Sequence, residues 1–157
     1  MAIRNNVTRL LDQRKVPYTA FELPAEKLGA IEAAQFLGVA AELVYKTIVV
    51  SREGKGKPVL AIVPGTAEVD LKLLAKAFME KKLRLPTEIE AERLTGLQAG
   101  GISPLALINR GFQVVLDATA LGHTEIYVSG GQRGLNIRLS PTDLVKLTNA
   151  AIYEISR

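Results

Sequence analysis

The sequence predicts an α/β protein of the α+β type, with a mixed, largely antiparallel sheet of about six to seven strands surrounded by helices. Helical patterns are scattered between pairs of strands, which argues against a doubly wound parallel sheet. Two glycine-containing turns, at 53–56 and 130–134, each separate two apolar or β-branched runs, as is typical of hairpins. The length of 157 residues suits one domain, which we expect to span 1–157.

The N-terminal part predicts two helices and three strands. Apolar residues at helical spacing before Pro17 indicate a helix at 2–15, and a short apolar stretch that ends at Gly38 indicates another at 31–37. Runs rich in β-branched residues predict strands at 18–23, 44–51 and 59–63.

The C-terminal part contains three sites at which helices can begin. Asp70 and Thr87 can each accept hydrogen bonds from the first free amide groups of a helix. Ser140, followed by proline, predicts a final helix that runs through Leu147. Further strands are expected at 113–116, 125–129, 135–139 and 151–155.

Composition excludes several classes of protein. The absence of cysteine rules out disulfides, Cys-ligated zinc, iron–sulfur clusters and a thiol nucleophile. His123 is the only histidine, and we expect neither a metal nor a cofactor, because no metal-ligand spacing and no phosphate-loop or dinucleotide motif is present. No signal-peptide pattern and no membrane-length apolar run occurs, so we expect a cytoplasmic protein with no membrane partner.

The net charge of +4 favours encounter with a polyanion such as RNA. Ordinary solvated lysines account for the same charge.

Lys46 interrupts an apolar strand pattern. Alternation over 44–50 places Lys46 on the same face as Ile48 and Val50. An ammonium group on an apolar face costs desolvation free energy, so such a lysine often lines a cleft that binds an anion. Alternatively, it lies at the strand end and extends its charged group into solvent.

The segment 100–104, Gly-Gly-Ile-Ser-Pro, is a candidate anion-binding turn. Its glycines permit positive φ and close approach to a ligand, and its successive amide groups can form an anion or oxyanion nest. A tight loop that needs glycine only for steric reasons is the alternative interpretation.

Ser103 with His123 would allow a serine-esterase mechanism. Pro104 argues against it, because a proline directly after the serine cannot supply the usual oxyanion-hole N–H.

In their order along the chain, these features resemble the YbaK/EbsC family of free-standing aminoacyl-tRNA deacylases, related to the editing domain of prolyl-tRNA synthetases. The resemblance covers nearly the whole chain. It is carried by Tyr45-Lys46-Thr47, Val63-Pro64 ahead of the Asp70 helix, Thr95-Gly96, Gly100-Gly101-Ile102-Ser103-Pro104-Leu105, and Ile126-Tyr127-Val128-Ser129-Gly130-Gly131 with Arg133-Gly134-Leu135.

The resemblance implies a trans-editing enzyme with the fold of that editing domain. Such an enzyme cleaves the ester of a mischarged tRNA, here with Cys-tRNA(Pro) as the leading candidate, and so supports translation fidelity. It implies binding of a tRNA acceptor end that carries a small amino acid, with prolyl-tRNA synthetase as a possible partner.

The resemblance also implies roles for particular residues. Lys46 would hold the terminal phosphate or ribose and counter developing charge, while Gly100 and Gly101 would hold the carbonyl near backbone amides. No enzyme nucleophile is required, because water or the substrate's own thiol can attack an activated ester. Substrate binding is expected at Tyr45, Thr47, Ile102, Ser103, Pro104, Ser129, Gly130 and Arg133.

Three departures bear on the substrate. The segment 21–24 lacks the tyrosine expected in the cysteine-specific branch, and Leu97 and Ala106 replace the Tyr and Gly that usually flank the turn. Alanyl and seryl esters therefore stay alternatives, because small side chains differ little in binding free energy. From a different class, a tRNA- or synthetase-binding module without turnover is the competing hypothesis.

Overall fold

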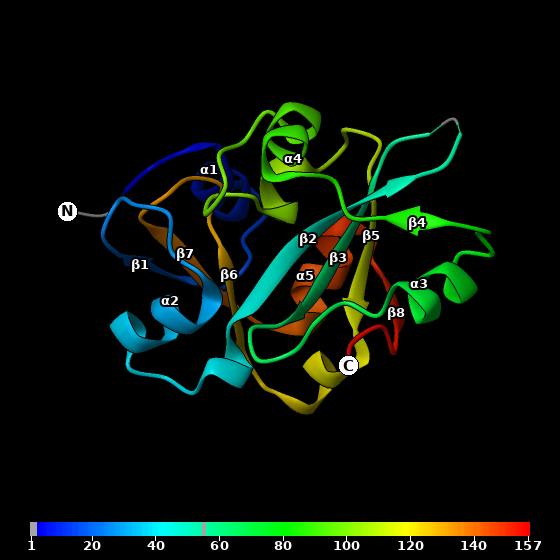
Figure 1. Ribbon diagram of the computed structural model, residues 1–157. Helices are drawn as coiled ribbons and strands as arrows, with labels where there is room; N and C mark the ends of the chain where they lie inside the picture. The colour runs from blue at the N-terminus through cyan, green and yellow to red at the C-terminus, as the bar shows by residue number, and fades with distance from the viewer. Residues whose placement is uncertain (1–2, 55) are drawn as a thin grey trace.

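The computed structural model describes residues 3–54 and 56–157, and its strands form two sheets (Figure 1). The three-stranded sheet has the order β1-β7-β6, with β1 at Thr19–Glu22, β6 at Ile126–Ser129 and β7 at Leu135–Leu139. The five-stranded sheet has the order β4-β2-β3-β5-β8, formed by Leu83–Arg84, Tyr45–Arg52, Val59–Pro64, Gln113–Asp117 and Ala151–Tyr153. Ala2 and Lys55, in the expected first helix and first turn, lie outside the described residues.

Strand pairing confirms a mixed, largely antiparallel α+β fold. Both expected hairpins form, as the antiparallel pairs β2–β3 and β6–β7. Strand β5 pairs in parallel with β3 and with β8. An isolated parallel bridge between Val44 and Tyr127 links the start of β2 to β6, so the two sheets meet there.

The helices begin at the expected capping residues, apart from the first two. They are α1 at Asn6–Gln13, α2 at Ala30–Leu37, α3 at Leu71–Ala77, α4 at Glu88–Thr95 and α5 at Pro141–Thr148. Asp70, Thr87 and Ser140 each accept hydrogen bonds from amides of the first turn, as predicted. Helix α1 starts later than expected, because the Asn5 side chain accepts from the Thr8 amide at 3.0 Å.

Some short elements were not predicted. They are the two-residue strand β4 and the 3₁₀ segments η1 at Ala41–Leu43, η2 at Pro104–Leu107 and η3 at Ala118–Gly122. A single turn is too short to show hydrophobic periodicity. Strand β8 ends at Tyr153 rather than at 155, where the Ile155 amide donates instead to the Asp117 carboxylate at 2.9 Å.

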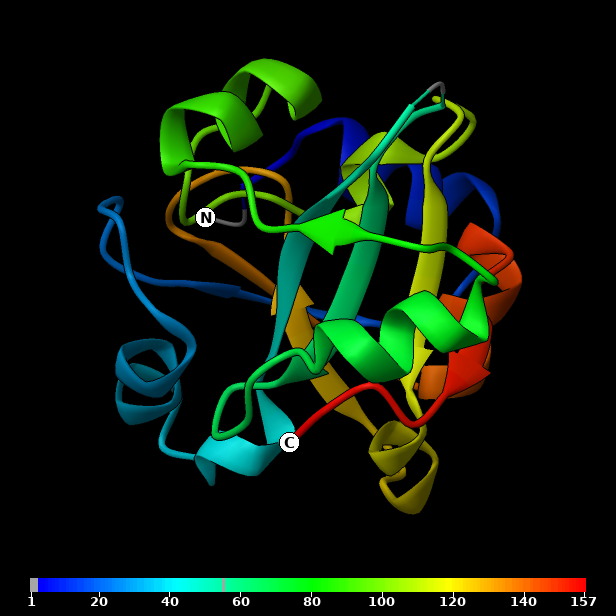
Figure 2. The same cartoon turned by 45° about the vertical axis from the view of Figure 1, so that its right-hand side comes forward.

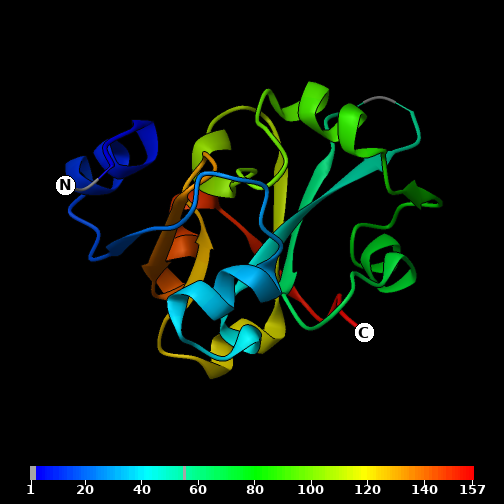
Figure 3. The same ribbon diagram turned by 60° about the vertical axis from the view of Figure 1, so that its left-hand side comes forward.

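Buried side chains pack on both faces of the five-stranded sheet. One face and the three-stranded sheet enclose the main core with α1 and α5, through residues such as Leu60, Ile137 and Leu144. Helix α3 covers the other face, where Leu74 packs (Figure 2). Helix α2 covers the outer side of the three-stranded sheet, where Tyr127 packs (Figure 3). The first residues of β2 thus lie where all these layers meet.

Candidate active site

A pocket opens where the start of β2 meets the three-stranded sheet. Its volume is about 300 Å³, and strands β2, β6 and β7 form its wall together with the loops at 27–30 and 99–102. The Gly65 amide donates to the Val44 carbonyl at 2.7 Å and fixes the start of β2. Of the residues predicted from sequence, those that line the pocket are Tyr45, Lys46, Thr47, Gly100, Ile102 and Ser129. The fold therefore brings Lys46 and the glycine turn together.

The remaining predicted site residues lie outside the pocket lining. They are Gly101, Ser103, Pro104, Gly130 and Arg133. Ser103 is fully buried, and its Oγ accepts from the Leu105 amide at 3.1 Å, so it caps η2. The Gly130 amide donates to the Leu135 carbonyl at 2.9 Å and closes the β6–β7 turn. In this structure Ser103 and Gly130 stabilise the segments next to the pocket.

The serine-esterase hypothesis finds no support in this geometry. A nucleophile must be reached by its substrate, but Ser103 has an exposed fraction of 0%. The His123 ring packs instead against the ring of Tyr45, with centroids 6.3 Å apart.

Lys46 enters the pocket from the first residues of β2. It lies opposite Val63 in the hairpin, and Ile48 and Val50 pack toward α3 as the alternation predicts. The Lys46 side chain is 27% exposed, and its Nζ lies 3.9 Å from Oε1 of Glu68, whose side chain is 78% exposed. Water screens an ion pair of this length and exposure. The ammonium is therefore available to an anionic ligand.

The glycine turn borders the pocket and contains two amides without a hydrogen-bond partner at 3–54 or 56–157. Gly100 is exposed with a φ of +89°, a conformation that favours glycine. Within the described part of the chain, the amides of Gly100 and Ile102 have no hydrogen-bond partner, whereas the Gly101 amide donates to the Gln98 carbonyl at 2.8 Å. Of the two predicted glycines, only Gly100 keeps an amide that could donate to a ligand, whereas the Gly101 amide closes the turn.

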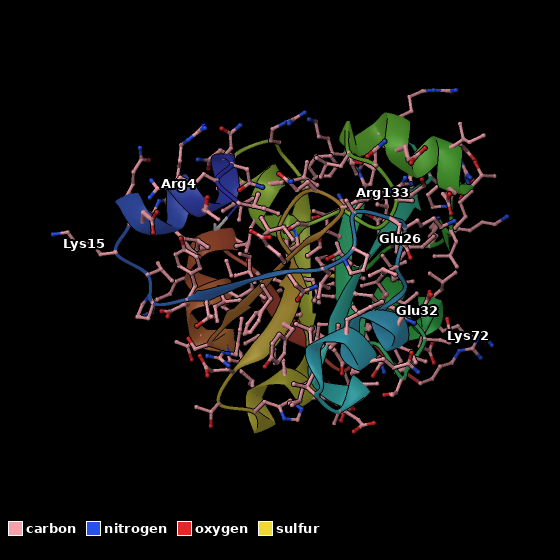
Figure 4. The ribbon with its side chains drawn as sticks, turned by 90° about the vertical axis from the view of Figure 1, so that its left-hand side faces the viewer. Arg4, Lys15, Glu26, Glu32, Lys72 and Arg133 are labelled. Atoms are coloured by element: carbon pink, nitrogen blue, oxygen red, sulfur yellow. The ribbon has the colours of Figure 1, made fainter. Side chains whose placement is uncertain are left out.

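Gly101 has a steric role of its own. A Cβ at this position would lie 2.8 Å from the Gln132 Cα and 3.0 Å from the Arg133 amide nitrogen. The Arg133 side chain joins the same two turns, since its Nε donates a hydrogen bond to the Ala99 carbonyl at 2.8 Å. Figure 4 shows Arg133 at the loops above α2, on the same side of the molecule as Glu26. The turn at 99–102 is therefore held against the β6–β7 turn.

An ion pair borders the pocket. The Lys27 ammonium contacts the Glu88 carboxylate at the start of α4, and both side chains are about half exposed. Sequence patterns missed this pair, because both residues resemble ordinary surface charges and come from distant segments.

The start of α4 depends on ionised Glu90. The backbone amide of Thr87 donates to Glu90, and so does the Arg84 guanidinium, each at 3.1 Å. These bonds, the Thr87 amide first, lower the pKa of Glu90 from 4.5 to about 2. A carboxyl group whose pKa is lower in the folded state stabilises the protein at pH values above its unfolded-state pKa. This stabilisation is lost as the pH falls through the folded-state pKa.

We expect the Glu90→Gln variant to melt below the native protein at pH 6. The difference in melting temperature should shrink as pH falls below about 4.5 and be almost lost near pH 2, because Glu90 of the native protein then becomes neutral like the glutamine of the variant. Thermal unfolding followed by circular dichroism measures this. A melting difference that does not change with pH would contradict it.

Thr47 and Asn136 both line the pocket, and each has a buried side-chain oxygen, Oγ1 and Oδ1, without a hydrogen-bond partner among the described residues. Thr47 was predicted, but Asn136 was not. Alternation places Asn136 on the outer face of β7, between inward-facing Leu135 and Ile137. A polar residue there is typical of a solvent-facing position, so no sequence signal could have identified it.

No group of three or more histidine or acidic side chains that could hold a metal occurs at 3–54 or 56–157. Over the same residues, no helix has the length and apolar character needed to cross a membrane.

Comparison with known proteins identifies the family. A family model described as the aminoacyl-tRNA editing domain matches residues 25–147. The chain belongs to the aminoacyl-tRNA editing domain family. A relative from Enterococcus faecalis, named "Putative Cys-tRNA(Pro)/Cys-tRNA(Cys) deacylase EbsC", is 36% identical over 98% of this chain and 93% of its own length. Membership in the YbaK/EbsC family, expected from the ordered motifs, is confirmed.

More distant proteins are also similar to this chain. "Prolyl-tRNA editing protein ProX" from Acetoanaerobium sticklandii is 24% identical over 96% of this chain and 93% of its own length. A crystal structure named "a putative trans-editing enzyme for prolyl tRNA synthetase" matches 99% of both chains, with a TM-score of 0.82 and 28% identity. The expected editing-domain fold is thereby confirmed.

Proposed function

We propose that this editing domain, residues 1–157, cleaves the ester of mischarged aminoacyl-tRNA in trans and so supports translation fidelity in the cytoplasm. One observation carries the proposal. Lys46 lines the same pocket as Gly100 and Ile102, whose amides have no hydrogen-bond partner among the described residues. Amide donors suit a developing oxyanion, and an ammonium suits the phosphates of an RNA end.

The proposed mechanism relies on electrostatics. The ester carbonyl lies at the Gly100 turn, whose amides stabilise the oxyanion formed on attack. Lys46 holds the terminal phosphate or ribose and counters the added negative charge. Water, or a substrate side chain, adds to the carbonyl carbon and loses a proton; the bond to the ribose oxygen breaks, and that oxygen takes up one proton in exchange. The chain has no cysteine and Ser103 is fully buried, so neither a thiol nor this serine acts as the nucleophile in the proposed mechanism.

We infer that Cys-tRNA(Pro) is the leading substrate, with alanyl and seryl esters as alternatives. The Enterococcus faecalis relative is named for Cys-tRNA(Pro) and Cys-tRNA(Cys). The small pocket, bordered by Ala33 and Val44, suits a small aminoacyl group. Association with prolyl-tRNA synthetase is part of this proposal, because the structural match above is named as acting for that synthetase.

Release of amino acid from tRNA(Pro) charged with cysteine, alanine, serine or proline tests the proposal. We expect rapid loss of at least one noncognate ester and none of prolyl-tRNA(Pro). Lack of release from every member of the panel, with and without added prolyl-tRNA synthetase, would contradict the deacylase function and favour a binding module.

A further inference from the structure

Asp117, the last residue of β5, has a buried carboxylate that the proposed mechanism does not use. The residue is 1% exposed. Within residues 3–54 and 56–157, no lysine, arginine or histidine forms an ion pair with it. A buried charge without a counter-ion is costly unless hydrogen bonds satisfy it. The groups that donate these bonds therefore indicate what Asp117 holds in place.

Four hydrogen bonds satisfy the Asp117 carboxylate, and they come from two segments of the chain. Its Oδ2 accepts from the amide and the hydroxyl of Thr119, which belongs to η3. The same oxygen accepts from the Ser156 hydroxyl at 3.0 Å, and Oδ1 accepts from the Ile155 amide at 2.9 Å. Asp117 thus fixes both η3 and the C-terminal residues to the end of β5.

The hydrogen bond from the Thr119 hydroxyl continues toward the pocket. The Oγ1 of Thr119 lies 2.9 Å from the hydroxyl oxygen of Tyr45. A carboxylate only accepts hydrogen bonds, so the single hydroxyl proton of Thr119 points to Asp117. Tyr45 must then donate to Thr119. The negative charge of Asp117 therefore sets the direction of the whole chain, in which each bond polarises the next.

Tyr45 is the residue at which this chain meets the pocket. It lines the pocket, and it directly precedes Lys46. The Tyr45 ring is buried, and the ring of His123, the residue directly after η3, packs against it with centroids 6.3 Å apart. Segment 118–123 therefore holds Tyr45 by its ring and by its hydroxyl, on the face of β2 opposite to Lys46.

The C-terminal residues connect Asp117 to the other face of β2. The Glu68 amide donates to the Arg157 carbonyl at 3.0 Å, and the Arg157 amide donates to the Glu68 carbonyl at 2.9 Å. The Glu68 carboxylate lies 3.9 Å from the Lys46 Nζ. Because water screens this long ion pair, the hydrogen-bonded route through Tyr45 is the stronger of the two.

We propose that Thr119, held by Asp117, is a positioning residue: through the Tyr45 hydroxyl it fixes the first residues of β2 and so keeps Lys46 in place in the pocket. This inference rests on the proposed deacylase function. Neither Thr119 nor Asp117 lines the pocket, so each acts on catalysis only through other residues. Catalytic groups need placement within about 0.5 Å, and a shift of about 1 Å can lower a rate by about 100-fold.

The variants Tyr45→Phe and Thr119→Val each remove one hydroxyl of the chain. Each should lower kcat/KM for the ester that the native protein cleaves best by about 5-fold, the effect of one lost hydrogen bond. The double variant should lose no more than the poorer single variant, because both changes break the same connection. Thr119→Ser keeps a hydroxyl and should be more active than Thr119→Val.

Non-additivity separates positioning from direct contact with the substrate. If the Tyr45 hydroxyl instead contacted the substrate, Thr119→Val would be as active as the native protein, which would overturn the inference. Losses that multiply in the double variant, or equal activities for Thr119→Val and Thr119→Ser, would also overturn it.

Thr148→Val is the matched control for Thr119→Val. The Thr148 hydroxyl donates to the Leu144 carbonyl at 2.7 Å within α5, and Thr148 lies outside the pocket lining. Its removal should leave kcat/KM within about 2-fold of the native value, since the lost bond lies within one helix. A loss as large as that of Thr119→Val would show that any missing hydroxyl lowers activity, and would contradict the inference.

Amide hydrogen exchange followed by NMR tests the positioning even if the native protein cleaves no ester. In Thr119→Val, the amides of residues 45–47 should exchange about 5-fold faster, while those of α5 keep their native rates. Native rates at 45–47 would overturn the inference independently of the proposed function. Equal acceleration at 45–47 and in α5 would indicate a general loss of stability and would contradict it as well.

Discussion

Replacing Lys46 by alanine is expected to lower kcat/KM for deacylation by about 100-fold or more, because one electrostatic contact to a transition state typically contributes that much. Protein stability should change by less than about 1 kcal/mol, since the Lys46–Glu68 pair is long and its carboxylate is mostly exposed. Initial rates of amino-acid release, measured with urea unfolding of the same samples, check both expectations.

Two variants serve as controls for Lys46. Lys46→Arg keeps the positive charge and should retain part of the activity, although a guanidinium does not reproduce the position of an ammonium. Lys72→Ala removes an exposed lysine on α3 outside the pocket lining (Figure 4) and should act like the native protein. Equal rates for native and Lys46→Ala protein would rule out the role assigned to Lys46.

The substitution Gly101→Ala is expected to have the second-largest effect. Its Cβ would lie 2.8 Å from Gln132 Cα and 2.9 Å from the Gln132 carbonyl carbon, closer than atoms tolerate. Since the obstacle is backbone, one of the two turns must move, which should cost about 1–3 kcal/mol. Movement at 99–102 would also misplace the Gly100 and Ile102 amides, so we expect at least a 10-fold loss of kcat/KM at 25 °C.

Gly122→Ala is the matched control, because Gly122 has no positive φ and a Cβ there would meet no atom within 4 Å. It should be neutral in unfolding and in activity. The steric argument fails if Gly101→Ala is as stable and as active as Gly122→Ala.

Local patterns predicted most of the elements. Capping side chains at Asp70, Thr87 and Ser140 identified three helix starts, since a cap depends only on nearby amides. Glycine turns likewise located both hairpins. The sequence did not indicate that β5 pairs in parallel with β3 and β8, because these pairs join segments far apart in the chain.

Prediction of the candidate site was more uneven. The break in the strand pattern at Lys46 pointed to the pocket, and the structure confirms that Lys46 and Gly100 border it. Ser103, by contrast, proves to be a buried cap, and Gly101 a close contact between loops. A glycine or serine in a motif has the same sequence signature whether it binds a ligand or fits a tight space.

The sequence by itself determined the family, the α+β class and the position of Lys46, because these follow from ordered motifs and local periodicity. Tertiary structure alone decided which residues face the pocket, which amides stay without a partner, and that Asn136 joins Thr47 there. The physical reason is that the exposure of a side chain and the hydrogen bonds of an amide depend on contacts between segments that are far apart in the sequence. Local sequence patterns contain no information on such contacts.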